Sequence, residues 1–166
     1  MTDSDTARPS AESKDRVFLV VVDETEEMQV ALRFACRRAR RTGGRVALLY
    51  VIEPADFQHW RAVEELMREE ARNEGEQLLQ RLAAQVNEQV GAIPILYVRE
   101  GQVADELLKL LDEEPQISIL VLGANTSNRG PGPLVSAVSG KMIGKLRVPV
   151  TLVPGNLSDE AIDAIS

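Results

Sequence analysis

The stretch from 117 to 154 places the strongest constraint on what this chain can fold into. An apolar run from Ile117 to Leu122 is interrupted only by Ser118, as is typical of strands buried on both faces of a parallel sheet. A Gly-rich loop follows, then apolar residues at helical spacing, then a second apolar strand from Val148 to Val153. Together these form one βαβ unit. In such units phosphates bind at the loop and the helix N-terminus that follow the first strand.

The rest of the chain repeats this alternation of apolar strands and amphipathic helices. Further strands are predicted over Arg16–Val22, Val46–Ile52 and Ile93–Val98. Helices are predicted over about Glu26–Arg41, Arg61–Val90, Val103–Glu114, the stretch that carries Leu134, Val138, Met142 and Leu146, and Asp159–Ile165. The pattern predicts an α/β fold, a five-stranded parallel sheet with helices on both faces and right-handed crossovers.

Local signals add detail to this pattern. Thr25 is the expected N-cap of the first helix, and Gly43-Gly44 is expected to end it. Gly75 predicts a kink or a break in the long second helix. Pro94 predicts that the third strand is an edge strand or has an irregular entry.

The 166 residues predict one soluble domain over 16–155, with a polar, disordered leader over 1–15 and a tail or short helix over 156–166. No apolar run approaches the length of a membrane span. A single cysteine, Cys36, excludes an internal disulfide and is expected to be a core thiol rather than a reactive one. These features predict a cytoplasmic protein that does not bind membranes.

The formal charge of −7 argues against general nucleic-acid binding, which depends on neutralising phosphates. One cluster of arginines stands out against this charge. It comprises Arg33, Arg37, Arg38, Arg40 and Arg41. We expect a solvated helix face, with cations gathered near the negative end of the helix dipole. The alternative is a patch that binds a polyanion.

Five segments of the chain resemble the universal stress protein family, in the family's order. They are VVVDETEE, LLYVIEP, REGQVADELL, ILVLGA and VPVTLVP. The resemblance covers about Arg16 to Pro154. It implies a doubly wound, Rossmann-like fold of the adenine nucleotide alpha-hydrolase type. It also implies a non-catalytic stress-response module that forms a homodimer through its last strand. Some members of the family bind ATP or AMP, with Mg²⁺ held by the nucleotide, and others bind none.

The family's nucleotide-binding loop has a Gly-x-x-Gly pair, then Gly-Ser or Gly-Thr, then a helix and a Pro-Val pair. Its register fits this chain without a gap, but only Gly123 is retained. Thr126 and Ser136 stand in place of glycines, and Ala137 in place of the hydroxyl residue. A β-branched residue resists the positive φ that a loop glycine adopts, and alanine donates no hydrogen bond. We therefore expect weak adenine-nucleotide binding through a degenerate loop; the alternative is a dimeric interaction module that binds no nucleotide.

The resemblance also assigns residues to the predicted site. Asp23 would contact the ribose or adenine side, and Val51 would line the adenine pocket by its backbone. The full set of expected nucleotide-binding residues is Val22, Asp23, Val51, Leu122, Gly123, Asn125, Thr126, Ser136, Ala137 and Val138.

Several patterns that would indicate an enzyme or a metal site do not occur in this sequence. The one histidine, His59, lies beside Trp60 and has no evident Ser or Cys partner by motif. There is no G-x-S-x-G elbow and no Walker GK[ST] sequence. The acidic run between Glu64 and Glu76 contains no His or Cys, and we expect it to form a solvated face of the predicted helix. We expect no catalytic activity, and no metal other than Mg²⁺ with a nucleotide.

Overall fold

The computed structural model of the chain describes residues 16–54 and 61–166. The predicted leader, 1–15, and the segment that carries His59 and Trp60 lie outside the described residues. Strands and helices alternate along the described part. Their bounds are β1 Val17–Val21, α1 Glu26–Thr42, β2 Arg45–Ile52, α2 Arg61–Val90, β3 Ile95–Glu100, α3 Val103–Glu113, β4 Ile117–Ala124, α4 Pro133–Ser139, the 3₁₀ helix η1 Ile143–Lys145, β5 Val150–Pro154 and α5 Asp159–Ile165.

The five strands form one parallel sheet in the order β3-β2-β1-β4-β5. This confirms the predicted doubly wound α/β fold. The strand order reverses between β1 and β4, so the carboxyl ends of these two strands flank the switch point where such folds bind ligands. β3 and β5 are the two edge strands, as Pro94 and the position of the final strand predicted.

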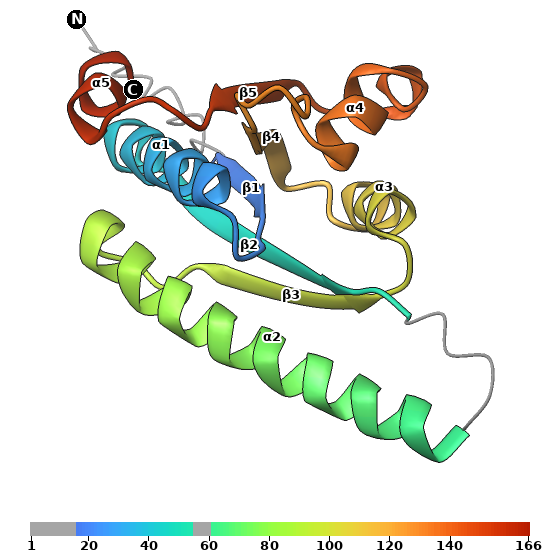
Figure 1. Cartoon of the computed structure of the whole chain (residues 1–166). Helices are drawn as coiled ribbons and strands as arrows, with labels where there is room; N and C mark the ends of the chain where they lie inside the picture. Colours follow the sequence, from blue (N-terminus) through green and yellow to red (C-terminus); the bar gives the residue numbers. More distant parts are fainter. Residues whose placement is uncertain (1–15, 55–60) are drawn as a thin grey trace, which may run out of the picture.

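Helices cover both faces of the sheet (Figure 1). α1, α2 and α5 lie on one face and α3 and α4 on the other, because alternate strand residues point to opposite sides. In β1, Phe18 and Val20 belong to the first core cluster, and Val17 and Leu19 to the second. Cys36 is fully buried in the first cluster. Burial raises the pKa of its thiol to about 12, which keeps it protonated and unreactive, as predicted.

Both ends of α1 are stabilised as the sequence predicted. The Thr25 hydroxyl oxygen accepts a hydrogen bond from the backbone N–H of Met28 at 3.2 Å, and so caps the N-terminus. Gly43, at φ 69°, ends the helix in the left-handed conformation that glycine adopts without steric cost.

The kink predicted at Gly75 is wrong, because α2 is continuous over its 30 residues. Gly75 instead lies against the ring of Tyr50 on β2, and a Cβ at this position would overlap that ring. The glycine therefore lets the helix approach the sheet closely. No helix among residues 16–54 and 61–166 is long and apolar enough to cross a membrane.

The helix predicted after the glycine loop is shorter than expected. α4 ends at Ser139, and Gly140 follows in a conformation outside the helical region. The predicted helical residue Met142 instead lies in a turn, where its N–H donates to the Ala137 carbonyl. Lys141, predicted to lie inside the helix, is in the same turn. Glycine is a poor helix former, which accounts for the early end.

The prediction of a solvated arginine face on α1 is wrong for three of its members. Arg33, Arg37 and Arg41 all contact α5, whose Ile162 is fully buried against the first core cluster. α5 itself has the predicted bounds, and Ser158 caps it by accepting from the Ala161 N–H.

Arg147, between η1 and β5, holds the C-terminus of α3 to the sheet. Its Nε donates to the Leu111 carbonyl at 2.9 Å and its Nη2 donates to the Glu114 carbonyl at 3.0 Å. Carbonyls at the end of a helix have no partner within the helix, so a guanidinium that reaches them replaces water.

We predict that Arg147→Ala lowers the free energy of unfolding by about 1 kcal/mol, because the carbonyls lose a charged donor. Chemical denaturation followed by circular dichroism measures this change. Arg147→Lys is the matched control: it keeps the charge but lacks the planar fork, so it should retain only part of the stability. Equal stability of all three chains would contradict this role for Arg147.

Candidate functional site

The candidate site lies at the switch point, between the carboxyl ends of β1 and β4. A hollow of about 130 Å³ opens there. Its walls come from the end of β1, the first turn of α1, the end of β4 and the segment that enters α4. They are Val21, Asp23, Thr25, Glu27, Met28, Leu122, Gly123, Pro131, Gly132, Pro133, Leu134 and Val135.

Asp23 holds the segment that connects β1 to α1. Its Oδ1 accepts a hydrogen bond from the Thr25 N–H at 2.8 Å and another from the Thr25 hydroxyl at 2.5 Å. The same hydroxyl oxygen caps α1. One carboxylate oxygen of Asp23 therefore orients Thr25, the N-cap of α1. The Asp23 side chain as a whole is exposed at the rim of the hollow.

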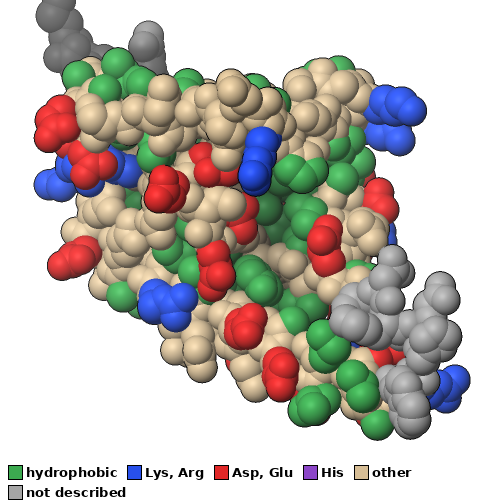
Figure 2. All heavy atoms as spheres, viewed as in Figure 1, with side chains coloured by type: hydrophobic (Ala, Val, Ile, Leu, Met, Phe, Trp, Pro, Cys, Tyr) green, Lys and Arg blue, Asp and Glu red, His purple; other side chains and the backbone are tan. Residues whose placement is uncertain are grey.

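The site is acidic. Asp23, Glu24, Glu26 and Glu27 follow one another around the start of α1, with only Thr25 between them. The face seen in Figure 2 is hollowed near its centre, where hydrophobic side chains show; acidic side chains lie around the hollow, and a basic side chain lies just above it. These acidic side chains interact favourably with the positive end of the α1 helix dipole, but they repel an anionic ligand.

Gly123 is the glycine that the family motif retains, and the structure gives it a packing role. A Cβ at this position would overlap the Glu27 carbonyl and lie 2.9 Å from the Met28 nitrogen. The first turn of α1 thus rests directly on the backbone of β4. This close approach explains the glycine without reference to a phosphate.

The loop after β4 satisfies much of its own hydrogen bonding. The Asn125 N–H donates to the Pro131 carbonyl at 3.1 Å, which closes the base of the loop. Within it, the Ser127 N–H donates to Asn125 Oδ1 at 2.7 Å, and the Arg129 N–H donates to the Ser127 hydroxyl oxygen at 3.3 Å. The N–H groups of Asn125, Ser127 and Arg129 are therefore already bonded within the loop and are not available to a phosphate in this conformation.

The turn positions of this loop differ from those that the family register predicted. Gly130 and Gly132 have positive φ values of 87° and 107°, and no non-glycine residue among the described residues has positive φ. Thr126 is therefore not held in a strained conformation, and that part of the prediction is wrong. The loop takes another path, with its left-handed turns beside Pro131.

The structure brings together only part of the predicted residue set. Asp23, Leu122 and Gly123 line the hollow. Asn125 and Thr126 line a second, more open depression beside Glu26 and Glu27. The other predicted residues, Val22, Val51, Ser136, Ala137 and Val138, are not among the residues that line either one.

Burial explains several of these placements. Val22 and Val138 are 3% and 1% exposed, so their side chains belong to the core. Val51 is half-buried and pairs with Arg99 of β3, one strand further from the switch point. Ser136 is exposed on α4, and its N–H already donates to the Gly132 carbonyl at 3.0 Å.

The sequence reasoning missed some of the wall. Pro131, Gly132 and Leu134 line the hollow because the chain turns back over β4 before α4 begins. The Pro-Gly-Pro sequence at 131–133 signals such a turn, but it does not show on which side of the strand the turn lies. Among residues 16–54 and 61–166, no group of three or more His, Cys, Asp or Glu side chains could hold a metal ion.

The parallel sheet in the order β3-β2-β1-β4-β5, with helices on both faces, defines the doubly wound α/β class of domain. The family model of the universal stress protein family matches residues 16–154. The chain therefore belongs to the universal stress protein family. No curated protein matches the chain significantly.

Solved structures with the same fold include several universal stress proteins. UspA from Lactobacillus plantarum is 19% identical, with a TM-score of 0.70, covering 83% of this chain and 97% of that one. A universal stress protein from Archaeoglobus fulgidus in complex with dAMP is 19% identical, with a TM-score of 0.56, covering 83% and 96%. An Arabidopsis thaliana member with AMP bound is 15% identical, with a TM-score of 0.56, covering 87% and 94%. At such identities the likeness shows the fold alone.

We predict that Gly123→Ala lowers the free energy of unfolding by roughly 1–3 kcal/mol, because the added Cβ pushes β4 and α1 apart. Thermal or chemical denaturation measures the loss. Gly144→Ala is the matched control, since a Cβ there meets nothing within 4 Å and should change stability little. If the two variants are equally stable, the close approach at Gly123 does not constrain the fold.

Proposed function

We propose that this chain is a non-catalytic universal stress protein module of the cytoplasm that acts by associating with a second copy and binds an adenine nucleotide only weakly. The observation that carries the proposal is the closed loop after β4, in which the N–H groups of Asn125, Ser127 and Arg129 donate hydrogen bonds within the loop. The absence of catalysis is inferred from the sequence, which has no Walker or nucleophile-elbow motif.

The residues at the switch point fit a polyphosphate poorly. The hollow is small and Asp23 and Glu27 are part of its wall. Pro131 and Pro133 lack N–H groups, and Ala137 lacks a hydroxyl. Each added phosphate group increases the repulsion from these carboxylates, so we propose that AMP is tolerated better than ATP, with Mg²⁺ offsetting part of the charge of ATP. The related proteins with bound AMP and dAMP support a monophosphate.

For a bound nucleotide, the family pattern assigns the following contacts. Asp23 would contact the ribose or adenine side, with Val22 beside it, and the backbone of Val51 would line the adenine pocket. Leu122, Gly123, Asn125, Thr126, Ser136, Ala137 and Val138 would surround the ribose and phosphates. Binding in this manner requires the loop to open, because its present hydrogen bonds close it over Pro131.

We predict that the triple variant Thr126→Gly, Ser136→Gly, Ala137→Ser binds ATP about tenfold or more tightly than the parent chain. The motif then regains loop freedom and one hydroxyl donor, and a hydrogen bond to a charged phosphate contributes roughly 1.5–3 kcal/mol. Titration calorimetry with ATP and AMP, at fixed salt and magnesium, measures both affinities.

Asn128→Gly serves as the control for this titration, since it adds a glycine to the same loop outside the motif. It should leave the affinity unchanged. Equal ATP affinity of the parent and the triple variant would show that these three residues do not limit binding.

The edge strand β5 supports the association with a second copy. Its sequence, VTLVP, has no charged residue, and Leu152 is 42% exposed. The other edge strand, β3, carries Arg99 and Glu100, which form ion pairs with Glu113 and Arg68. Charged edge strands resist pairing, whereas an uncharged apolar edge favours it. We therefore propose a homodimer in which two β5 strands pair.

We predict that the parent chain is a dimer at micromolar concentration and that Leu152→Lys makes it a monomer, since the charge would be buried between the paired strands. Sedimentation velocity measures the mass. Leu96→Lys is a matched control, because Leu96 is also 42% exposed but lies on β3. A dimer that Leu96→Lys breaks and Leu152→Lys leaves intact would place the interface at the opposite edge.

A further inference from the structure

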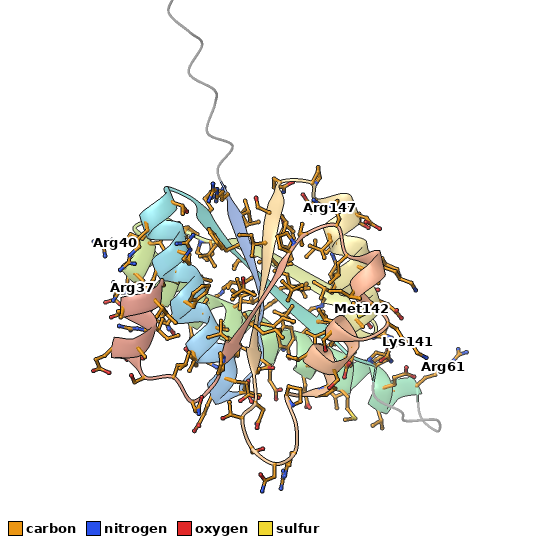
Figure 3. The ribbon with its side chains drawn as sticks, turned by 90° about the horizontal axis from the view of Figure 1, so that it is seen from above. Arg37, Arg40, Arg61, Lys141, Met142 and Arg147 are labelled. Atoms are coloured by element: carbon orange, nitrogen blue, oxygen red, sulfur yellow. The ribbon has the colours of Figure 1, made fainter. Side chains whose placement is uncertain are left out.

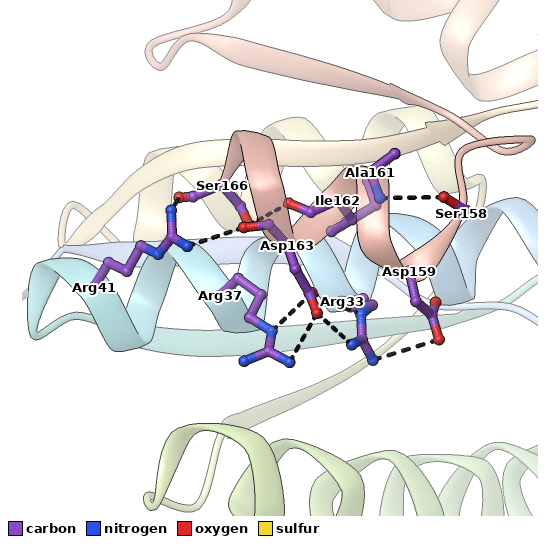
Figure 4. A network of polar contacts seen from close by, with 9 residues as sticks. All are labelled: Arg33, Arg37, Arg41, Ser158, Asp159, Ala161, Ile162, Asp163 and Ser166. Carbon is purple, nitrogen blue, oxygen red and sulfur yellow. Dashed lines mark hydrogen bonds and ion pairs between the residues drawn. The ribbon is translucent and has the colours of Figure 1, made fainter.

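The last helix, α5, lies alongside α1, on the side away from α2 (Figure 4). Ile162 is its fully buried side chain, and Leu157, just before the helix, packs against the same core cluster. The family match ends at Pro154, so α5 falls outside it. The contact between α5 and α1 is therefore a feature of this chain beyond the part that the family model describes.

Two arginines of α1 hold the same carboxylate of α5. Arg33 donates from Nε and Nη2 to the two oxygens of Asp163 at 3.0 and 2.8 Å. Arg37 donates to the same two oxygens at 3.0 and 3.2 Å. These contacts hold the pKa of Asp163 below its usual value, chiefly through the hydrogen bond from Arg33. Paired planar donors of this kind recognise a carboxylate with a defined orientation.

Further contacts extend this recognition to both sides of Asp163. Arg33 Nη1 lies 3.7 Å from Asp159, one turn earlier on α5. Arg41 donates to the Asp163 carbonyl at 2.9 Å and also to the carbonyl of Ser166. Arg33, Arg37 and Arg41 thus form a ladder, one turn apart along α1, that contacts the length of α5.

The two helices present complementary patterns. The ladder repeats every fourth residue of α1, which places its members on one face. On α5, Asp159, Ile162 and Asp163 occupy one face in the same way. The surface of α1 is therefore complementary to a short helix with an apolar residue flanked by acidic ones, as α5 is. Helices that present such faces are common ligands of grooves on other proteins.

α5 is too short to be stable without the rest of the fold. It has seven residues, fewer than a helix needs to be stable alone. Its helical state therefore depends on the burial of Ile162 and on the paired contacts of Arg33 and Arg37 with Asp163. Terminal segments are among those that open locally before a whole domain unfolds.

We propose that the arginine ladder on α1, with the slot that Ile162 fills, is a docking surface for an acidic amphipathic helix of another protein, and that α5 occupies it as an internal competitor. A partner helix binds only when α5 leaves the surface, so the stability of the docked α5 lowers the affinity of the module for that partner helix. The inference deepens the proposed function, since it names the partner class of the association module. It is independent of β5 pairing and of the nucleotide.

The test uses the full chain and a synthetic helical peptide with the sequence of residues 156–166 as the probe. Ile162→Asp and Asp163→Arg, made separately, each release α5 from the surface without deleting it. Isotope-labelled parent and variants are titrated with the peptide and followed by NMR. We expect at least tenfold tighter binding to each variant than to the parent, with shift changes centred on Arg33, Arg37 and Arg41.

Two controls define the recognition. Arg33→Ala combined with Asp163→Arg should lose the peptide, whereas Arg40→Ala in the same background should not. Arg40 is exposed, and in Figure 3 it projects from the outer side of α1. A peptide in which the two aspartates are replaced by lysine should not bind.

Three outcomes would overturn the proposal. The first is that both release variants remain folded and the peptide binds neither of them. The second is that its shift changes lie away from α1. The third is that the peptide with lysine in place of the two aspartates binds a release variant as tightly as the unchanged peptide does. Loss of β5 pairing or of nucleotide affinity would leave the peptide result unchanged, so failure of the proposed function is distinguishable.

Discussion

The first turn of α1 rests against the carboxyl ends of two neighbouring strands, and much of the structure depends on this contact. Glycines permit it in both places. Besides Gly123, the residue after β5 is Gly155, where a Cβ would lie 2.6 Å from the Glu27 Cβ. This packing fixes the position of α1 over the sheet. It therefore sets the size of the hollow at the switch point and the direction in which the arginine face of α1 points.

The same contact gives a packing explanation for Gly123, the glycine that the family motif retains. In a nucleotide-binding loop, such a glycine allows the backbone to approach a phosphate. In this chain the neighbour that approaches Gly123 is the backbone of α1, and the carboxylates of Asp23 and Glu27 lie beside it. The packing of α1 against β4 is therefore sufficient to explain the glycine at this position.

Much of the fold was predictable because the strands are apolar runs and the helices have strong periodicity. The bounds of α2 and α5 agree with the prediction to the residue. β3 and β5 begin two residues later than expected, after Pro94 and Pro149 respectively. The end of α4 was missed because an apolar period continued past Gly140, and the tertiary structure did not extend the helix through that glycine.

The candidate site was predictable at the strand ends and less so in the loop. Asp23 and Gly123 follow directly from strand ends in a parallel sheet. The closure of the loop depends on which side chains bond to which backbone groups, and these bonds have no periodic signal. The arginine cluster was visible in sequence, but its partner Asp163 lies 130 residues from Arg33. A single sequence does not show complementarity over that separation.

The unequal edges of the sheet have a consequence for how large an assembly can grow. β5 is uncharged and β3 carries paired charges. When two copies pair β5 with β5 about a two-fold axis, each copy uses its own pairing edge on the other. The combined sheet then ends in a charged β3 strand on both sides. In the proposed dimer, growth would stop at that point, because charged edge strands resist further pairing.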